Sequence, residues 1–301
     1  MMAAVGSDVV NFWETSLTKW IEQACVMEVM TPKPGNVYPG KAYDDAGLED
    51  FIASARIIAP ILAASSRHGI GLSILSAVRQ TQRECGTNTN LGIILLIAPM
   101  AAVPPDRSLS VGIQDVLSGL STEDAHHVYE AIRLADPGGL GSVEEQDVRQ
   151  PPDRSLVECM KLAADRDMVA RRYVNGFDDV LTICRCGLRH ARAFTGDQRQ
   201  QVGLVALRLL ACEGDSLIAR KCGSEMSELV SDKAASIVAA GWPDTPESHE
   251  MWKALDTFLR VDGNRRNPGT TADMIAAALF AALREGCLTP RGGWWKADAK
   301  S

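Results

Sequence analysis

The stretch Leu91-Gly-Ile-Ile-Leu-Leu-Ile-Ala-Pro-Met-Ala-Ala-Val103 decides the fold class of this chain. Its first half could form a buried β-strand on composition alone, because a short apolar run does not distinguish a strand from a buried helix. The run continues beyond Pro99 through four more apolar residues, which favours a buried helix with a proline kink. Its 13 residues are also fewer than the roughly 18 that a membrane-spanning helix needs.

Helical periodicity extends over nearly the whole chain on both sides of this run. Apolar positions three and four residues apart follow one another in 13–28, 48–62 and 275–282. Alternating strand patterns with hairpin signals are absent from the sequence. The chain is therefore predicted to be an all-α protein, with residues 1–301 forming a single multi-helix domain. Further helices are predicted near 70–84, 91–102, 123–135, 155–173, 178–194, 199–212, 224–240 and 247–260.

The breaks in this periodicity are predicted to be loops between helices. The longest covers 136–153 and contains Pro-Gly-Gly-Leu-Gly followed by three acidic residues. Long loops inside compact domains are often functional, so this one is a candidate part of a binding site. The other loops are predicted at 31–45, 85–90, 103–108, 241–246 and 262–271.

Composition and charge narrow the classes of partner. The 301 residues include 31 Lys plus Arg and 38 Asp plus Glu, which gives a net charge of −7. This acidic balance argues against a broad grip on nucleic acid, although a local basic pocket for one small anion remains compatible with it. The eight cysteines are scattered through apolar segments, and the N-terminus lacks the features of a secretory signal. We therefore expect a cytoplasmic protein with reduced thiols and no membrane partner.

The most informative segment is Glu28-Val-Met-Thr-Pro-Lys-Pro-Gly-Asn-Val37. Glu28 lies on the apolar stripe of the first predicted helix and near the negative end of its dipole, two features that disfavour a carboxylate. Such a residue is a candidate site residue, unless it turns to solvent at the helix end. Lys33 stands between two prolines on a stiff loop, which suits an ammonium that meets a phosphate, unless it is an ordinary exposed lysine.

Three further segments combine polar residues with predicted helix starts. The Gly86–Gly92 segment and the 267–273 segment both carry Asn and Thr, which either cap helices or help the free N–H groups there to attract anions. Thr270 and Asp273 have the spacing of a capping box. The third segment, 213–216, places Asp215 near two basic residues, where a surface ion pair is the simple alternative.

Together these segments resemble the triphosphoribosyl-dephospho-CoA synthase family. The family motifs correspond here to Glu28–Gly35, Gly86–Gly92, Asp215–Gly223 and Pro268–Asp273, which occur in the family order across about 25–285. The resemblance implies an all-helical fold. It also implies a transferase that joins ATP to 3′-dephospho-CoA with release of adenine, which makes the precursor of an acyl-carrier prosthetic group.

The resemblance also implies roles for individual residues. Cleavage of the ribose–adenine bond builds positive charge at the sugar carbon, which carboxylates can stabilise while they move protons. The expected catalytic residues are Glu28, Asp45, Asp215 and Asp273, and the last three are also the expected ligands of Mg²⁺. The general base is not separated from the metal ligands. The residues expected to bind substrate and its phosphates are Thr31, Lys33, Asn36, Asn88, Thr89, Lys221, Thr270 and Thr271.

The chain departs from the family pattern at several positions. Tyr43 stands where the family usually has a histidine, and Asn90-Leu91 replaces a usual His-Lys pair. Near Arg172 and Val174 an acidic pair looks replaced. Loss of groups that pair with a charged substrate costs about 1.5–3 kcal/mol each, which is enough to redirect specificity. The 135–141 segment resembles a divergent branch of the family.

Two other functions stay open at this stage. The fold could persist as a catalytically idle nucleotide-binding or scaffold protein, or the chain could hydrolyse the glycosidic bond of a nucleotide with water as the acceptor. The expected partners are small molecules, ATP and an acceptor similar to dephospho-CoA. The acceptor, the metal count and the oligomeric state are not fixed by the sequence, and a homodimer is one candidate.

Overall fold

The structure is a computed structural model that describes residues 2–87, 89–291 and 293. Helices account for nearly all regular structure in this part of the chain, and the only β feature is an isolated bridge between Tyr38 and Lys41. The all-α prediction is therefore confirmed. The helices are α1 Met2–Val29, α2 Leu48–Ala63, α3 Ser65–His68, α4 Ile70–Cys85, α5 Leu91–Ala101, α6 Leu109–Ser118, α7 Thr122–Ala135, α8 Leu156–Ala163, α9 Met168–Val174, α10 Asp178–Thr182, the π-helix η1 Ile183–Gly187, α11 Leu188–Ala191, α12 Gln198–Glu213, α13 Ser216–Cys222, α14 Ser224–Ala239, α15 Pro246–Leu259, α16 Val261–Asn264 and α17 Gly269–Arg284.

Two helices that are apolar on all sides form the centre of the molecule. Ile93–Ala101 of α5 and Met274–Leu283 of α17 are buried throughout, and the two helices pack against each other. A helix without a polar face must be enclosed by other helices, which explains why the rest of the fold surrounds this pair. The run from 91 to 103 is thus a buried helix that contains Pro99, as its length and composition predict.

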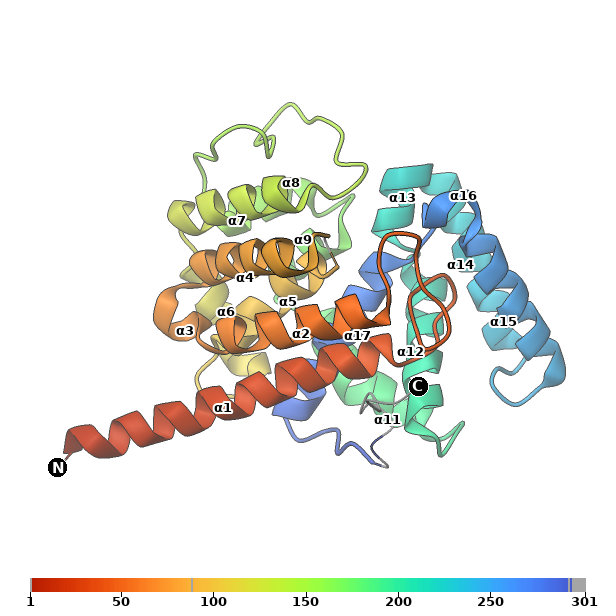
Figure 1. The fold of residues 1–301 in the computed structure, drawn as a ribbon, viewed down its shortest axis with the longest axis horizontal. Coiled ribbons are helices and arrows are strands. Elements are labelled where there is room, and N and C mark those ends of the chain that lie inside the picture. The colour runs from red at the N-terminus through yellow and green to blue at the C-terminus, as the bar shows by residue number, and fades with distance from the viewer. Residues whose placement is uncertain (1, 88, 292, 294–301) are drawn as a thin grey trace.

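The remaining helices lie on two sides of this centre (Figure 1). On one side α2, α4 and α7 pack in succession, with α1 along α2 and α17. On the other side α12, α14 and α15 pack in succession, and α12 also contacts α17. The loop after α1 lies between the two sides, whereas the long loop after α7 arches above α7 and α8.

Most predicted helices match the structure, and two of them are divided. The expected helix over 155–173 is interrupted after Ala163, and Asp167 caps the new helix α9 by accepting a hydrogen bond from Ala170 N. The expected helix over 178–194 contains the π-helical turn η1 between α10 and α11. Among the described residues, no helix is both long and apolar enough to cross a membrane.

Candidate active site

A cleft of about 1150 Å³ opens between the two sides of the molecule. Its walls come from the ends of α1, α5, α13 and α17 and from the loops that follow α1 and α7. The segments that carry the four family motifs therefore meet in one place. The predicted site residues that line the cleft are Glu28, Asn36, Asp45, Thr89, Asp215, Lys221, Thr270 and Asp273.

Glu28 and Lys33 form a buried ion pair at the base of the cleft. Lys33 Nζ lies 2.8 Å from Glu28 Oε1 and donates hydrogen bonds to the carbonyls of Glu28 (2.5 Å) and Thr31 (2.9 Å). An ammonium has three donors, so this one has none left for a phosphate. Only 4% of Glu28 and 2% of Lys33 are exposed, so both simple alternatives, a solvent-facing glutamate and an exposed lysine, are wrong.

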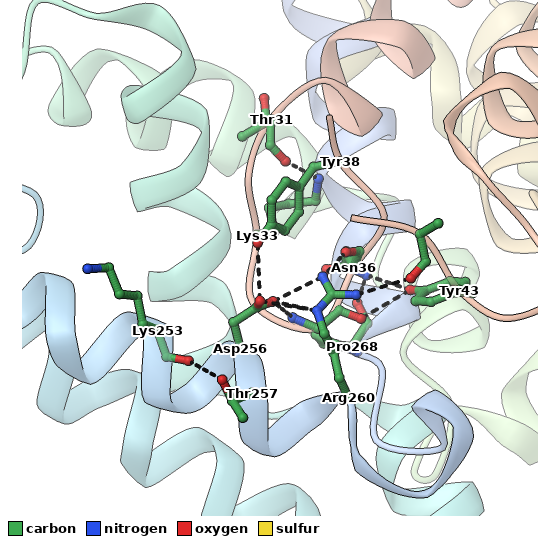
Figure 2. A network of polar contacts seen from close by, with 12 residues as sticks. Thr31, Lys33, Asn36, Tyr38, Tyr43, Lys253, Asp256, Thr257, Arg260 and Pro268 are labelled. Atoms are coloured by element: carbon green, nitrogen blue, oxygen red, sulfur yellow. Dashed lines mark hydrogen bonds and ion pairs between the residues drawn. The ribbon is translucent and has the colours of Figure 1, made fainter. Parts of the chain in front are cut away.

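The loop after α1 is fixed to α15 by a polar network (Figure 2). Asp256 accepts hydrogen bonds from Gly35 N (2.8 Å) and from Tyr38 Oη (3.1 Å), and Arg260 pairs with Asp256 at 3.0 Å. Arg260 also donates to the carbonyl of Asn36 at 2.5 Å. The bonds from Gly35 and Tyr38 to Asp256 and from Arg260 to Asn36 join residues more than two hundred positions apart, and they hold Asn36 and the segment around it at the cleft.

Asp215 is a structural carboxylate. Its Oδ1 accepts hydrogen bonds from Leu217 N and Ile218 N at the start of α13, and its Oδ2 accepts from Thr271 N and Oγ1 near the start of α17. Burial raises the pKa of Asp215, while these four hydrogen bonds act in the opposite direction. With 1% of the residue exposed, Asp215 is not part of a surface ion pair. Its oxygens tie two helix starts together.

Asp273 differs from Asp215 because no described residue gives its carboxylate a hydrogen bond or an ion pair. Burial raises the pKa of Asp273 well above its ordinary value, and the negative charges of Glu28, Asp215 and Asp167 add to this rise. The carboxylate lies against Gly92, where a Cβ atom would come within 2.1 Å of Asp273 Oδ2. Asp273 is thus a carboxyl group that lines the cleft and retains its proton more readily than an exposed aspartate does.

Two of the four cationic groups that line the cleft, Arg220 and Lys221, come from α13. Lys221 Nζ makes one described contact, at 3.3 Å from Asn267 Oδ1, and burial together with Arg220 lowers the pKa of Lys221. Arg220 pairs with Asp167 at 3.0 Å and donates to the carbonyl of Gly138 at 3.2 Å. Arg166 also lines the cleft. Lys221, and not Lys33, therefore offers free donors to an anion.

The remaining predicted polar residues divide into two groups. Thr89 lines the cleft and shares a 2.7 Å hydrogen bond with Ser54, and Thr270 lines the cleft and accepts a bond from Ser216. Thr31 and Thr271 instead donate to Met27 O and Asp215 within the protein. The predicted residue Asn88 lies outside the described residues.

Neither Asn90 nor the pair Thr270 and Asp273 makes the helix-capping contact that its position in the sequence predicts. Asn90 is the N-cap of α5, yet its side chain makes no capping hydrogen bond, and its buried Nδ2 has no partner in the described structure. The helix α17 starts after Pro268 without a side-chain cap, so the predicted capping box of Thr270 and Asp273 does not form. Both segments line the cleft, which is consistent with a binding role.

A magnesium site built from the protein alone is not found. Among the described residues, no three His, Cys, Asp or Glu side chains are grouped so that they could hold a metal ion. The oxygens of Asp215 are already engaged by four donors. Asp45 is exposed at the cleft, and it lies close enough to Lys221 for its negative charge to act on the pKa of that lysine. Because Mg²⁺ usually combines one or two carboxylates with substrate phosphates, Asp45 fits an ion that arrives with a nucleotide.

A second ion cluster, in which a buried arginine meets two partly exposed carboxylates, supports the wall of the cleft at Glu213. Arg172 is fully buried and lies 2.5 Å from Glu213 Oε2 and 2.8 Å from Asp179 Oδ2. Its Nε also contacts Met274 Sδ of α17 at 3.4 Å. The departure from the family pattern at position 172 thus has a structural reason, because the arginine is neutralised by two carboxylates.

Several residues of the cleft have no distinguishing pattern in the sequence. Arg220 is simply one of two basic residues near Asp215 in sequence, and its partner Asp167 has no local pattern because the pairing joins two helices distant in sequence. The long loop after α7 was selected by its length, and residues 136–143 and 145–148 do line the cleft.

Comparison with known proteins agrees with the motifs and the fold. Residues 14–290 match the family model for ATP:dephospho-CoA triphosphoribosyl transferase. A crystal structure of a proposed triphosphoribosyl-dephospho-CoA synthase from Archaeoglobus fulgidus has 28% sequence identity and a TM-score of 0.60, and the match covers 78% of this chain and 99% of that one. A search of curated proteins finds no match. Since the family model matches most of its length, this chain belongs to the ATP:dephospho-CoA triphosphoribosyl transferase family.

Proposed function

We propose that the cleft transfers the triphosphoribosyl group of ATP to a hydroxyl group of 3′-dephospho-CoA or a related acceptor, with release of adenine. The observation that carries this proposal is the composition of the cleft. Asp273, a carboxyl group without a partner among the described residues, shares the cleft with the paired carboxylate Glu28 and with the cation Lys221. Breakage of a glycosidic bond beside a polyanion needs these three kinds of group.

The two carboxyl groups are suited to different protonation states. Asp273 has no cation partner among the described residues and has a strongly raised pKa, so it is suited to hold a proton. Burial also raises the pKa of Glu28, but the contacts with Lys33 oppose that rise and favour the ionised form. Two carboxyl groups whose environments separate their protonation states are a recognised acid and base arrangement.

This division gives a balanced reaction. The acceptor hydroxyl oxygen bonds to the sugar carbon while the bond from that carbon to the adenine nitrogen breaks. Asp273 gives its proton to the departing adenine, and Glu28 stabilises the positive charge at the sugar and takes the proton of the hydroxyl. Lys33 orients Glu28 and favours its ionised form, and Asp215 keeps the starts of α13 and α17 in register.

The triphosphate is assigned to the α13 side of the cleft. Lys221 has donors to spare, and Arg166 and Arg220 line the same cleft. If magnesium accompanies the nucleotide, Asp45 would hold it together with the phosphates, and the ion would supply positive charge for the triphosphate. Asn36, Thr89 and Thr270 would contribute neutral hydrogen-bonding groups.

The proposal is tested by incubating the chain with ATP and measuring adenine, with and without 3′-dephospho-CoA. We expect adenine to appear only when the acceptor is present, together with a conjugate that carries both parts. Adenine with free ribose triphosphate would instead indicate a hydrolase. Failure to bind or consume any nucleotide would overturn the proposal in favour of an idle binding or scaffold protein.

Replacing Lys221 by methionine should weaken the binding of ATP. Hydrogen bonds to charged groups are worth about 1.5–3 kcal/mol, so the KM for ATP should rise roughly ten- to hundredfold. Lys161, an exposed lysine that does not line the cleft, provides the matched control Lys161→Met. An unchanged KM for ATP in Lys221→Met, measured as initial rate against ATP concentration, would remove Lys221 from the phosphate site.

A further inference from the structure

The long loop after α7, residues 136–153, covers one end of the cleft and is called the roof below. Its later part is held on α7, because Tyr129 Oη donates to Gln146 O at 2.8 Å and Arg133 Nη1 donates to Val148 O at 2.6 Å. Its first part is held on α13 by the bond from Arg220 to Gly138 O at 3.2 Å. The roof therefore joins the two sides of the molecule above the cleft.

Beneath this roof the lining of the cleft includes, besides charged groups such as Glu145 and Asp165, apolar side chains that remain accessible to solvent. Ile132 belongs to α7, Leu162 belongs to α8, and the roof itself contributes Leu140, Val143 and Val148. The helices α7 and α8 pack against each other, so these groups belong to one region of the protein. We call these five residues the apolar end of the cleft. Accessible apolar surface in a cleft is the usual signature of a site for an uncharged part of a ligand.

The positions of the charged groups indicate which kind of ligand can extend into the apolar end. The catalytic carboxyl groups lie on α1 and α17. The cations Arg220 and Lys221 lie on α13, the helix that holds the first part of the roof. A ligand that extends from the catalytic carboxyl groups to the apolar end would therefore place an anionic part near α13 and an uncharged part under the roof. ATP carries its uncharged adenine on the side of the sugar opposite the triphosphate, so it has no uncharged part beyond its phosphates. An acceptor with a diphosphate followed by a long amide-containing arm has both parts in this order.

We infer that the apolar end is the subsite for the uncharged arm of the acceptor, and that the roof determines which acceptors are used. This inference rests on the proposed function, since it assigns the second substrate to the same cleft. The cleft volume of about 1150 Å³ exceeds the upper end of the roughly 300–1,000 Å³ typical of sites for a single small ligand, which accords with two substrates bound together.

The inference is tested by placing a charge on the roof with Leu140→Asp. Leu140 is 39% exposed, so the folded protein should tolerate the change, and Leu229→Asp on α14 is the matched control because Leu229 is 42% exposed and does not line the cleft. The probes are 3′-dephospho-CoA and ADP, which is the same acceptor without its arm. The readouts at saturating ATP are the KM for dephospho-CoA and the inhibition constant of ADP against it, with calorimetric binding of dephospho-CoA as a measurement that needs no turnover.

We expect Leu140→Asp to weaken dephospho-CoA about tenfold by either readout while ADP, the KM for ATP and the Leu229→Asp control change by less than about twofold. Equal weakening of ADP and dephospho-CoA, or no weakening of either, would overturn the inference. A wild-type chain that binds dephospho-CoA no more tightly than ADP would also overturn it. Failure of the proposed function is seen separately, as the absence of adenine release from ATP, and the calorimetric comparison still decides the inference in that case.

Discussion

Replacing Asp273 by asparagine is expected to slow triphosphoribosyl transfer about 10²–10⁴-fold, the usual contribution of a positioned general acid. The reason is the state of its carboxyl group, which lines the cleft, has no described protein partner and has a strongly raised pKa. An amide has nearly the same shape and cannot give a proton to the departing adenine. Single-turnover release of adenine from ATP with saturating dephospho-CoA measures this step directly.

Asp165→Asn is the matched control for this experiment. Asp165 is an exposed aspartate that lines the same cleft, so its replacement removes one negative charge from the cleft as Asp273→Asn does. We expect the control to keep nearly the wild-type rate. If Asp273→Asn also released adenine at close to the wild-type rate, Asp273 would not be the proton donor.

The same variant should remove the loss of stability that Asp273 causes at higher pH. A raised pKa in the folded state means that the folded chain binds the proton of Asp273 more tightly than the unfolded chain does, so stability falls as pH rises from the ordinary aspartate range through the raised pKa of Asp273. Asp273→Asn removes this loss. The variant should therefore gain stability relative to wild type with increasing pH, as measured by urea unfolding at several pH values. A constant difference would contradict the assigned shift.

Replacing Lys33 by methionine is expected to lower the free energy of unfolding by about 3–5 kcal/mol, the usual cost of leaving one member of a buried ion pair alone. Both members of the pair with Glu28 are almost fully buried, and the ammonium also donates to two carbonyl groups that would lose their partner. Urea unfolding at neutral pH measures the change.

Two comparison variants test whether the loss of stability comes from the unpaired buried charge. In the double variant Glu28→Gln with Lys33→Met neither of the two positions carries a buried charge, so much of the stability should return. Lys253→Met removes an exposed lysine from a surface pair with Glu250 and should leave stability unchanged within error. If Lys33→Met were no more destabilising than Lys253→Met, the buried pair would not be a determinant of the fold.

The fold was predictable because it depends on local pattern. Apolar spacing of three and four residues identifies most helices, and the length of the run from 91 to 103 separates a buried helix from a strand. The breaks within 155–173 and 178–194 were not predicted, because their periodicity continues across the interruption. The motifs also located the cleft, since Glu28 and Asp273 both line it.

The roles of individual side chains were less predictable, because they depend on contacts between segments far apart in sequence. Lys33 has the sequence features of a phosphate ligand, but its ammonium is taken by the adjacent turn. Asp215 has the features of a catalytic carboxylate, but Thr271 from another helix occupies one of its oxygens. Only the tertiary structure shows which charged groups are already satisfied. The oligomeric state stays open, with a homodimer as one candidate.

The ion cluster around Arg172 constrains how this lineage can change. Asp179 and Glu213 are both held by the buried arginine, so an acidic residue at position 172 would place a buried negative charge beside two carboxylates and leave all three without a cation. A single substitution at position 172 toward the acidic residue of the family pattern should therefore destabilise this protein. A return to the family pattern would require coordinated substitutions at all three positions, and such epistasis limits the transfer of residue roles from one branch of the family to another.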